Sequence, residues 1–240
     1  MDEQGKQSDE QIQRTLTILT TEHYNLQSAR AATISETSAR AALFLSTVSS
    51  GLVALGFVAQ VLRGEGLYVF SLVLFPTLLF LGLVTFERVL QSSIQDIVSA
   101  RGINRIRHFY TEIDPRAASY FILSTHDDQA GTMADMGIHP SPWQYFVTLA
   151  GMVAVIDGVI AGVFAGLLIS LLEGALGLKV GVGAVAPPTV GGALVFILAV
   201  VVQQRYQDAQ WRTAVGGLPV LFPSPRGQTP TGAAPTNPTV

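Results

Sequence analysis

The sequence of 240 residues contains no cysteine and few charged residues. Without cysteine there is no disulfide framework, no thiol nucleophile and no thiolate metal site. Charged residues make up 13% of the chain, about half the roughly 25% that is typical of soluble domains. The mean hydropathy of +0.42 agrees with this deficit and indicates a membrane protein.

Signatures of catalysis and of cofactor binding are also missing from the sequence. There is no Walker motif, nucleophile elbow or HExxH segment. His126, Asp127 and Asp128 are consecutive, and three adjacent side chains rarely converge on one metal ion. The net charge of −3 does not favour nucleic acid as a partner. We therefore expect a protein that is not an enzyme and that uses no cofactor or metal.

Four apolar stretches are present instead, each suited to cross a bilayer as a helix. The longest has 27 residues, which span about 40 Å as a helix against a hydrocarbon core of about 30 Å. The expected spans are Ala41–Leu62, Leu67–Phe86, Phe146–Leu172 and about Pro188–Gln204. The predicted fold is all-α and integral to the membrane, with four transmembrane helices in two hairpins and helical extensions in the cytoplasm.

The segments outside the spans also show helical patterns. A seam of period 3.5 runs from Ile12 to Thr37, and no Gly or Pro lies between Lys6 and Ser50, which predicts one long helix from Asp9 into the first span. A second apolar stripe follows Glu87, and we expect the two stripes to pack as an antiparallel stalk. Further expectations are a short helix from Pro115, a loop at 124–140, and disorder at 1–8 and 216–240.

Basic residues predict how the chain is threaded. Twelve of the 14 Lys and Arg residues lie in three segments, and the two short loops between paired spans hold only Arg63 and Lys179. By the positive-inside rule, both termini and the middle segment are cytoplasmic, in a multi-pass protein of the cell membrane. The predicted parts are an N-terminal helix (1–40), a first hairpin (41–86), a helical linker (87–145), a second hairpin (146–204) and a largely disordered tail (205–240).

Asp157 is the one ionisable residue of the third span and lies near its middle. Carboxylates inside membranes are candidates for proton or cation passage. The structural alternative is a protonated carboxyl that donates a hydrogen bond to Ser46, Ser49, Ser50 or a backbone carbonyl. Both interpretations predict that the Asp157 side chain faces other helices rather than lipid.

Small residues predict where helices approach one another. Gly158, Gly162 and Gly166 are spaced by four on the third span, and Ser46, Ser49 and Ser50 line the first. Faces of this kind are typical of close helix packing, within a subunit or between copies. We list all six as candidate helix-packing residues.

Arg101, Arg105 and Arg107 form a basic cluster after the second span. Such clusters contact anionic lipid headgroups or phosphates next to membranes. The alternative is an ordinary excess of positive charge on a solvated cytoplasmic helix.

Two segments resemble known sequences. TTEH (Thr20–His23) precedes the first span and NRIRH (Asn104–His108) follows the second. In these features the chain is similar, over about residues 14–115, to a group of uncharacterised bacterial multi-span membrane proteins. This resemblance implies a membrane location and no particular activity. A weaker likeness is to the two-span effector modules of bacterial nucleotide-signalling defence systems, which also flank a hairpin of spans with cytoplasmic helices.

These observations lead to three hypotheses about function. The first is a self-associating interaction or effector protein, a homo-oligomer in the lipid bilayer with a cytoplasmic protein partner in some settings. The second is a small proton- or cation-coupled carrier or channel that uses Asp157. The third is an accessory subunit of another membrane complex.

Overall fold

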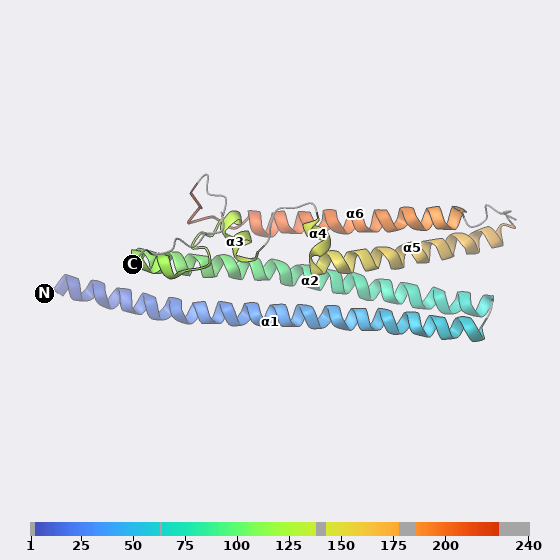
Figure 1. The fold of residues 1–240 in the computed structure, drawn as a ribbon, viewed down its shortest axis with the longest axis horizontal. Coiled ribbons are helices and arrows are strands. Elements are labelled where there is room, and N and C mark those ends of the chain that lie inside the picture. Colours follow the sequence, from blue (N-terminus) through green and yellow to red (C-terminus); the bar gives the residue numbers. More distant parts are fainter. Residues whose placement is uncertain (1–2, 63, 138–142, 178–185, 226–240) are drawn as a thin grey trace, which may run out of the picture. The chain divides into compact units, whose positions relative to one another are not determined.

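The computed structural model describes residues 3–62, 64–137, 143–177 and 186–225, and these contain helices and no strand. Helices α1, α2, α5 and α6 are each long and apolar enough to cross a membrane, which confirms the predicted all-α membrane fold. The elements in chain order (Figure 1) are α1 (Glu3–Val61), α2 (Glu65–Ile113), the 3-10 helix η1 (Pro115–Tyr120), α3 (Gln129–Asp135), α4 (Gln144–Val147), α5 (Leu149–Ala175) and α6 (Ala186–Gly216).

The chain forms two compact units, which are described one at a time. The first unit, called the polar unit below, comprises residues 1–31, 96–140 and 218–240. The second, called the apolar unit, comprises residues 32–95 and 141–217. Helices α1 and α2 contribute residues to both.

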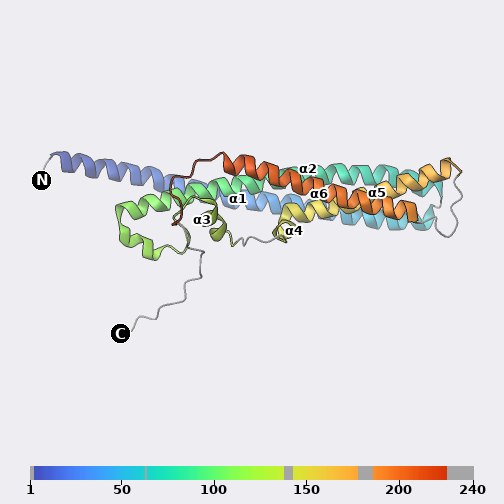
Figure 2. The ribbon, with the colours of Figure 1, turned by 90° about the horizontal axis from the view of Figure 1, so that it is seen from above.

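The apolar unit is built from two helical hairpins. Residues 32–61 of α1 lie beside residues 65–95 of α2, and α5 lies beside α6 (Figures 1 and 2). Both hairpins contribute to a common core of buried side chains: Phe44, Phe75, Leu78, Phe86, Val89, Leu90, Ala150, Val153, Ala154 and Ile160. Burial of these side chains against one another holds α1, α2 and α5 together, and Trp211 of α6 packs against the same core.

The third span begins later than expected. Thr148 is extended (φ −69°, ψ 153°) and its hydroxyl accepts a hydrogen bond from the Gly151 amide at 3.0 Å. This N-cap separates α4 from α5, so the prediction of one continuous helix from Phe146 was wrong. The helix that contains the fourth predicted span extends beyond it at both ends, since α6 runs from Ala186 to Gly216.

In the polar unit, the start of α1 packs on the end of α2. Leu16, Leu19, His23 and Leu26 are partly buried, whereas the residues between them are exposed. A Cβ added to Gly102 would lie 3.0 Å from Leu26 Cδ1, and the rings of His23 and Tyr110 stack with centroids 6.2 Å apart. The seam on α1 therefore faces α2, which confirms the predicted pairing of the two stripes over this length.

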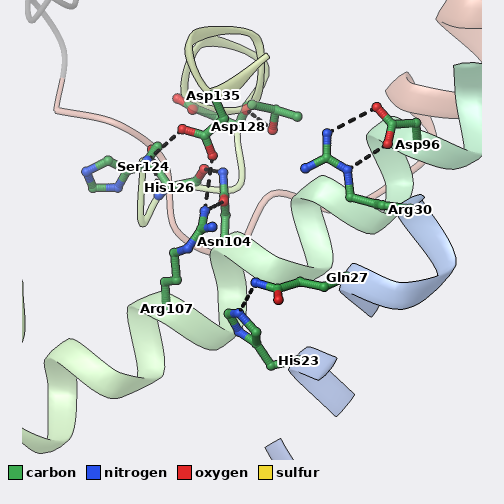
Figure 3. Close-up of polar contacts among 11 residues, drawn as sticks. His23, Gln27, Arg30, Asp96, Asn104, Arg107, Ser124, His126, Asp128 and Asp135 are labelled. Atoms are coloured by element: carbon green, nitrogen blue, oxygen red, sulfur yellow. Dashed lines mark hydrogen bonds and ion pairs between the residues drawn. The ribbon is translucent and has the colours of Figure 1, made fainter. Parts of the chain in front are cut away.

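An ion pair closes this packing. Arg30 donates two hydrogen bonds to the carboxylate of Asp96, from Nε at 2.6 Å and from Nη2 at 3.1 Å (Figure 3). Bidentate pairing of this kind adds geometric specificity to the contact. Arg30, a charged residue of the seam, is thus paired with a carboxylate on the facing helix.

The predicted loop at 124–140 was wrong in part. Asp128 caps a helix, α3, by accepting a hydrogen bond from the Gly131 amide at 2.8 Å. The short helix after Asp114 is confirmed, as the 3-10 helix η1 with Asp114 as its N-cap. Residues 138–140 of the predicted loop lie outside the described residues.

Both terminal segments are more regular than composition predicted. Helix α1 begins at Glu3, within the stretch 1–8 expected to be disordered. At the other end, residues 218–225 follow α6 and make hydrogen bonds to the rest of the polar unit that are described below. Residues 226–240 lie outside the described part of the chain.

Candidate functional site

Asp157 lies in the core of the apolar unit, with a side chain that is 0% exposed. Its neighbours along α5 include the buried core residues Val153, Ala154 and Ile160. Neither carboxyl oxygen has a hydrogen-bond partner among the described residues. A charge at such a position is far more costly than a neutral carboxylic acid, because nothing nearby replaces the lost water.

The carboxyl faces α2 at a glycine. A Cβ added to Gly82 would lie 1.6 Å from Asp157 Oδ1 and 3.0 Å from Phe44 Cζ. Only a residue without a side chain leaves room for Asp157 at this contact. Gly82 was not singled out from the sequence, although a lone glycine in an apolar span is the signal that could have indicated it.

Ser46, Ser49 and Ser50 do not supply the hydrogen bond that was considered for Asp157. All three are exposed on α1. The inward face of this part of α1 is formed by apolar residues, among them Phe44 and Val48. The three hydroxyl groups therefore point away from the core of the chain.

The glycine ladder of α5 packs on α6 of the same chain. A Cβ at Gly162 would lie 2.7 Å from the carbonyl oxygen of Gly192, and one at Gly166 would lie 3.0 Å from that of Pro188. At Gly158 it would lie 2.7 Å from Val200 Cγ2. The two backbones approach so closely that side chains at these positions would separate the helices.

Two residues of the basic cluster are paired with carboxylates of the polar unit. Arg105 Nε donates to Asp127 Oδ2 at 2.7 Å. Arg107 Nη1 donates to Asn104 Oδ1 at 2.8 Å and lies 3.4 Å from Asp135 Oδ2 (Figure 3). The third, Arg101, is only 5% exposed. Internal pairing and burial leave this cluster less able to attract an anion than its sequence indicated.

Asp127 joins the cluster to the segment after α6. Its carboxylate, 0% exposed, accepts hydrogen bonds from the amides of Leu221 at 3.1 Å and Phe222 at 2.8 Å. Burial disfavours the charged form, but these amides together with Arg105 outweigh burial and lower the pKa of Asp127. The Arg105 guanidinium also donates to the carbonyl oxygen of Pro219.

Asp128 makes a parallel set of contacts with the same segment. Its carboxylate accepts from the Ser224 amide and the Ser224 hydroxyl, each at 2.9 Å. The ring of Phe222 stacks on His108 with centroids 3.9 Å apart. Asp127 and Asp128 thus hold residues 219–224 on the rest of the polar unit, a role that no local pattern in the sequence signalled.

Among the residues that the structure describes, no group of three His, Asp or Glu side chains is placed to hold a metal ion. Chemically, Asp157 offers one carboxyl group at a fully buried position. The glycine ladder is a surface for helix contact within the chain. Comparison of the chain with protein-family models, with curated proteins and with solved structures finds no match.

Proposed function

We propose that the chain is a self-associating interaction or effector protein of the cell membrane, whose copies meet along the outward face of α1. The observation that carries this proposal is the exposure of Ser46, Ser49 and Ser50 within an apolar helix. Hydroxyl groups on a lipid-facing surface gain nothing from hydrocarbon, whereas a second helix can pack closely against them. The proposed role is non-enzymatic.

Ser46 and Ser49 belong to a longer stripe in which small and polar residues predominate. They continue at steps of four and three through residues that are all exposed: Ala42, Ser46, Ser49, Val53, Gly56 and Gln60. A Cβ added to Gly56 would meet nothing within 4 Å. A spacing of this kind presents one narrow face, suited to a left-handed pair of helices.

Two other association features cannot serve this purpose, because they are occupied inside the chain. The seam on the start of α1 packs on α2, where Leu26 contacts Gly102. The ladder on α5 packs on α6, where Gly162 meets Gly192. The outward face of α1 is therefore the surface on which we base self-association.

The test is the oligomeric state of the full chain in nanodiscs, measured by light scattering or by subunit counting. We expect an oligomer that Ser49→Leu and Gly56→Leu weaken, because a larger side chain separates the paired helices. Ala193→Leu is the matched control, since Ala193 is an exposed small residue on α6. A wild-type chain that is strictly monomeric in both detergent and nanodiscs would contradict the proposal.

We further propose that both termini lie in the cytoplasm, on the basis of the distribution of Lys and Arg. Arg40 and Arg88 flank the first hairpin on one side, and the short connection on its other side holds only Arg63. Reporter fusions after residues 225 and 64 should be active on opposite sides of the membrane. Equal reporter activity on one side would refute this threading.

Proton or cation movement through Asp157 is the second candidate function. It is favoured by the absence of any hydrogen-bond partner for either Asp157 oxygen among the described residues. Intramembrane carboxylates of this kind mark ion and proton pathways. Measurement of proton or cation flux into proteoliposomes tests this candidate. The Asp157→Asn variant should lose the flux, and an unchanged flux in this variant would refute the candidate function.

A further inference from the structure

A pocket of about 240 Å³ opens between α1 and α2 in the apolar unit. Its walls combine apolar side chains, two threonines and two arginines: Arg40, Leu43, Phe44, Thr47, Leu81, Val84, Thr85 and Arg88. Arg40 immediately precedes the first apolar span, and Arg88 follows the end of the second by two residues. The arginines therefore mark the depth at which the apolar stretches of the hairpin end.

One carboxylate lies between the two arginines. Glu36 Oε1 accepts a hydrogen bond from Arg40 Nε at 2.8 Å and lies 3.7 Å from Arg88 Nη2. The side chains of Arg40 and Arg88 are 46% and 49% exposed, so each guanidinium still presents N–H groups to the outside. Two positive charges and one negative charge leave a net charge of +1 at the mouth of the pocket.

We propose that this pocket binds the headgroup and upper acyl region of one anionic phospholipid. A phosphodiester carries one negative charge and would bring the group Arg40, Arg88 and Glu36 to neutrality. Guanidinium groups match phosphate oxygens in geometry as well as in charge. The hydroxyl-bearing walls of Thr47 and Thr85 lie one to two helical turns deeper, where a glycerol ester would follow the phosphate.

The apolar lining selects a lipid over a free phosphate. Leu43, Leu81 and Val84 line the pocket on the side of the apolar spans. These side chains offer nothing to a hydrated inorganic ion, whereas they suit the first methylenes of an acyl chain. A zwitterionic lipid would fit the same space but would leave the net charge of the site uncompensated.

This location differs from the basic cluster that the sequence favoured for lipid contact. Arg105 and Arg107 are held by Asp127 and Asp135. Arg40 and Arg88 share a single carboxylate instead, and they adjoin an open pocket with apolar walls. The surplus positive charge and the apolar lining occur together at this site.

Native mass spectrometry of the full chain, released from mild detergent, tests the proposal with phosphatidylglycerol and phosphatidylcholine as probes. We expect one phosphatidylglycerol to be retained with at least about fivefold higher affinity than phosphatidylcholine. A factor of about five is what one Arg next to the membrane surface contributes to the binding of an anionic lipid. The double variant Arg40→Gln/Arg88→Gln should lose this preference. Glu36→Gln should increase it by about fivefold, because it removes the opposing charge.

Two further variants separate the pocket from general charge effects. Thr47→Trp fills the pocket and leaves its charges in place, so it should weaken retention of phosphatidylglycerol. Arg116→Gln is the matched control, because Arg116 is an exposed arginine of the polar unit that pairs with Asp114, and it should change nothing. Circular dichroism melts verify that each variant is folded.

Three results would overturn the proposal. The first is equal retention of the two lipids by the wild-type chain. The second is a loss of preference in Arg116→Gln as large as that in the double variant. The third is displacement of phosphatidylglycerol by inorganic phosphate at millimolar concentration, which would show that the site recognises phosphate without the lipid.

Discussion

Replacing Gly82 by alanine tests the packing around Asp157 directly. The added methyl group would lie 1.6 Å from Asp157 Oδ1 and 2.6 Å from Asp157 Cγ. It would also lie 3.0 Å from Phe44 Cζ, so the space is closed on two sides. Either the carboxyl must turn away within a fully buried site or α2 and α5 must separate.

The expected loss follows from the general cost of overpacking a core, about 1–3 kcal/mol. Alanine also favours the helical state over glycine by about 1 kcal/mol, and this gain would partly conceal the loss. Gly56→Ala provides the correction, because a Cβ at Gly56 meets nothing within 4 Å in the same chain and the same gain in helix propensity applies. Alanine, unlike leucine, also keeps a small residue on the outward face of α1, so the proposed association surface is preserved. The difference in stability between the two variants isolates the steric cost at Gly82.

Thermal or denaturant unfolding in detergent micelles, followed by circular dichroism, measures this difference. In soluble chains of 150–250 residues, each kcal/mol shifts Tm by about 2–4 °C. Gly82→Ala should therefore melt about 2–12 °C below Gly56→Ala. Both variants are read against the wild-type chain under the same conditions.

A double variant shows whether Asp157 is the cause. With Asp157→Ala in the background, the carboxyl no longer occupies the space and Gly82→Ala should cost less, with a coupling of about 0.5–3 kcal/mol. Two results would show that Asp157 does not pack on Gly82 as described. One is equal stability of Gly82→Ala and Gly56→Ala, and the other is that the stability effects of Gly82→Ala and Asp157→Ala simply add.

Two other predictions concern contacts between distant parts of the chain. Gly162→Leu should destabilise the pairing of α5 and α6, because the larger side chain forces the two backbones apart. Gly174→Leu should be tolerated, since a Cβ at Gly174 meets nothing within 4 Å. The measurement is Tm in micelles, and equal Tm values for the two variants would contradict the close contact at Gly162. The pKa of Asp127 is lowered from 3.8, so the docking of Leu221 and Phe222 should be complete at neutral pH and be lost only as pH falls below about 4. Hydrogen exchange of these two amides measures it: Asp127→Ala should speed exchange about tenfold or more at pH 7, and a loss of protection already between pH 7 and pH 5 would show that another group holds the segment.

Several expectations from the sequence were matched because they depend on local composition. The absence of Gly and Pro between Lys6 and Ser50 predicts an unbroken helix, and α1 runs from Glu3 to Val61. The cap formed by Asp114 before Pro115 predicts a helix start, and η1 begins there. Each of these signals acts through neighbours in the chain, where sequence patterns are most informative.

Other expectations failed where a single polar side chain overrides composition. Thr148 interrupts an otherwise apolar stretch by capping α5, and Asp128 starts α3 in a segment rich in loop residues. Both are N-caps that satisfy a backbone amide three residues ahead. The signal was present in the sequence at each position, but the surrounding composition favoured another interpretation.

The candidate sites depended more strongly on tertiary contacts. From the sequence, the ladder at Gly158, Gly162 and Gly166 could meet any helix, including one from another copy. In the structure it meets α6 of the same chain, which is why the proposed self-association is based on the outward face of α1 instead. The partner of a small-residue face is decided by which helices lie beside it, and this information is not carried by the face itself.

The sequence alone determined that the chain contains four apolar helices long enough for a bilayer, because transfer of a segment into hydrocarbon depends on its own length and composition. Only the tertiary structure decided that Asp157 packs on Gly82, that Arg105 pairs with Asp127, and that Asp127 holds residues 221 and 222. These contacts join residues from 22 to 95 positions apart in the chain. Their energies arise from burial and geometry that exist only once the helices are packed.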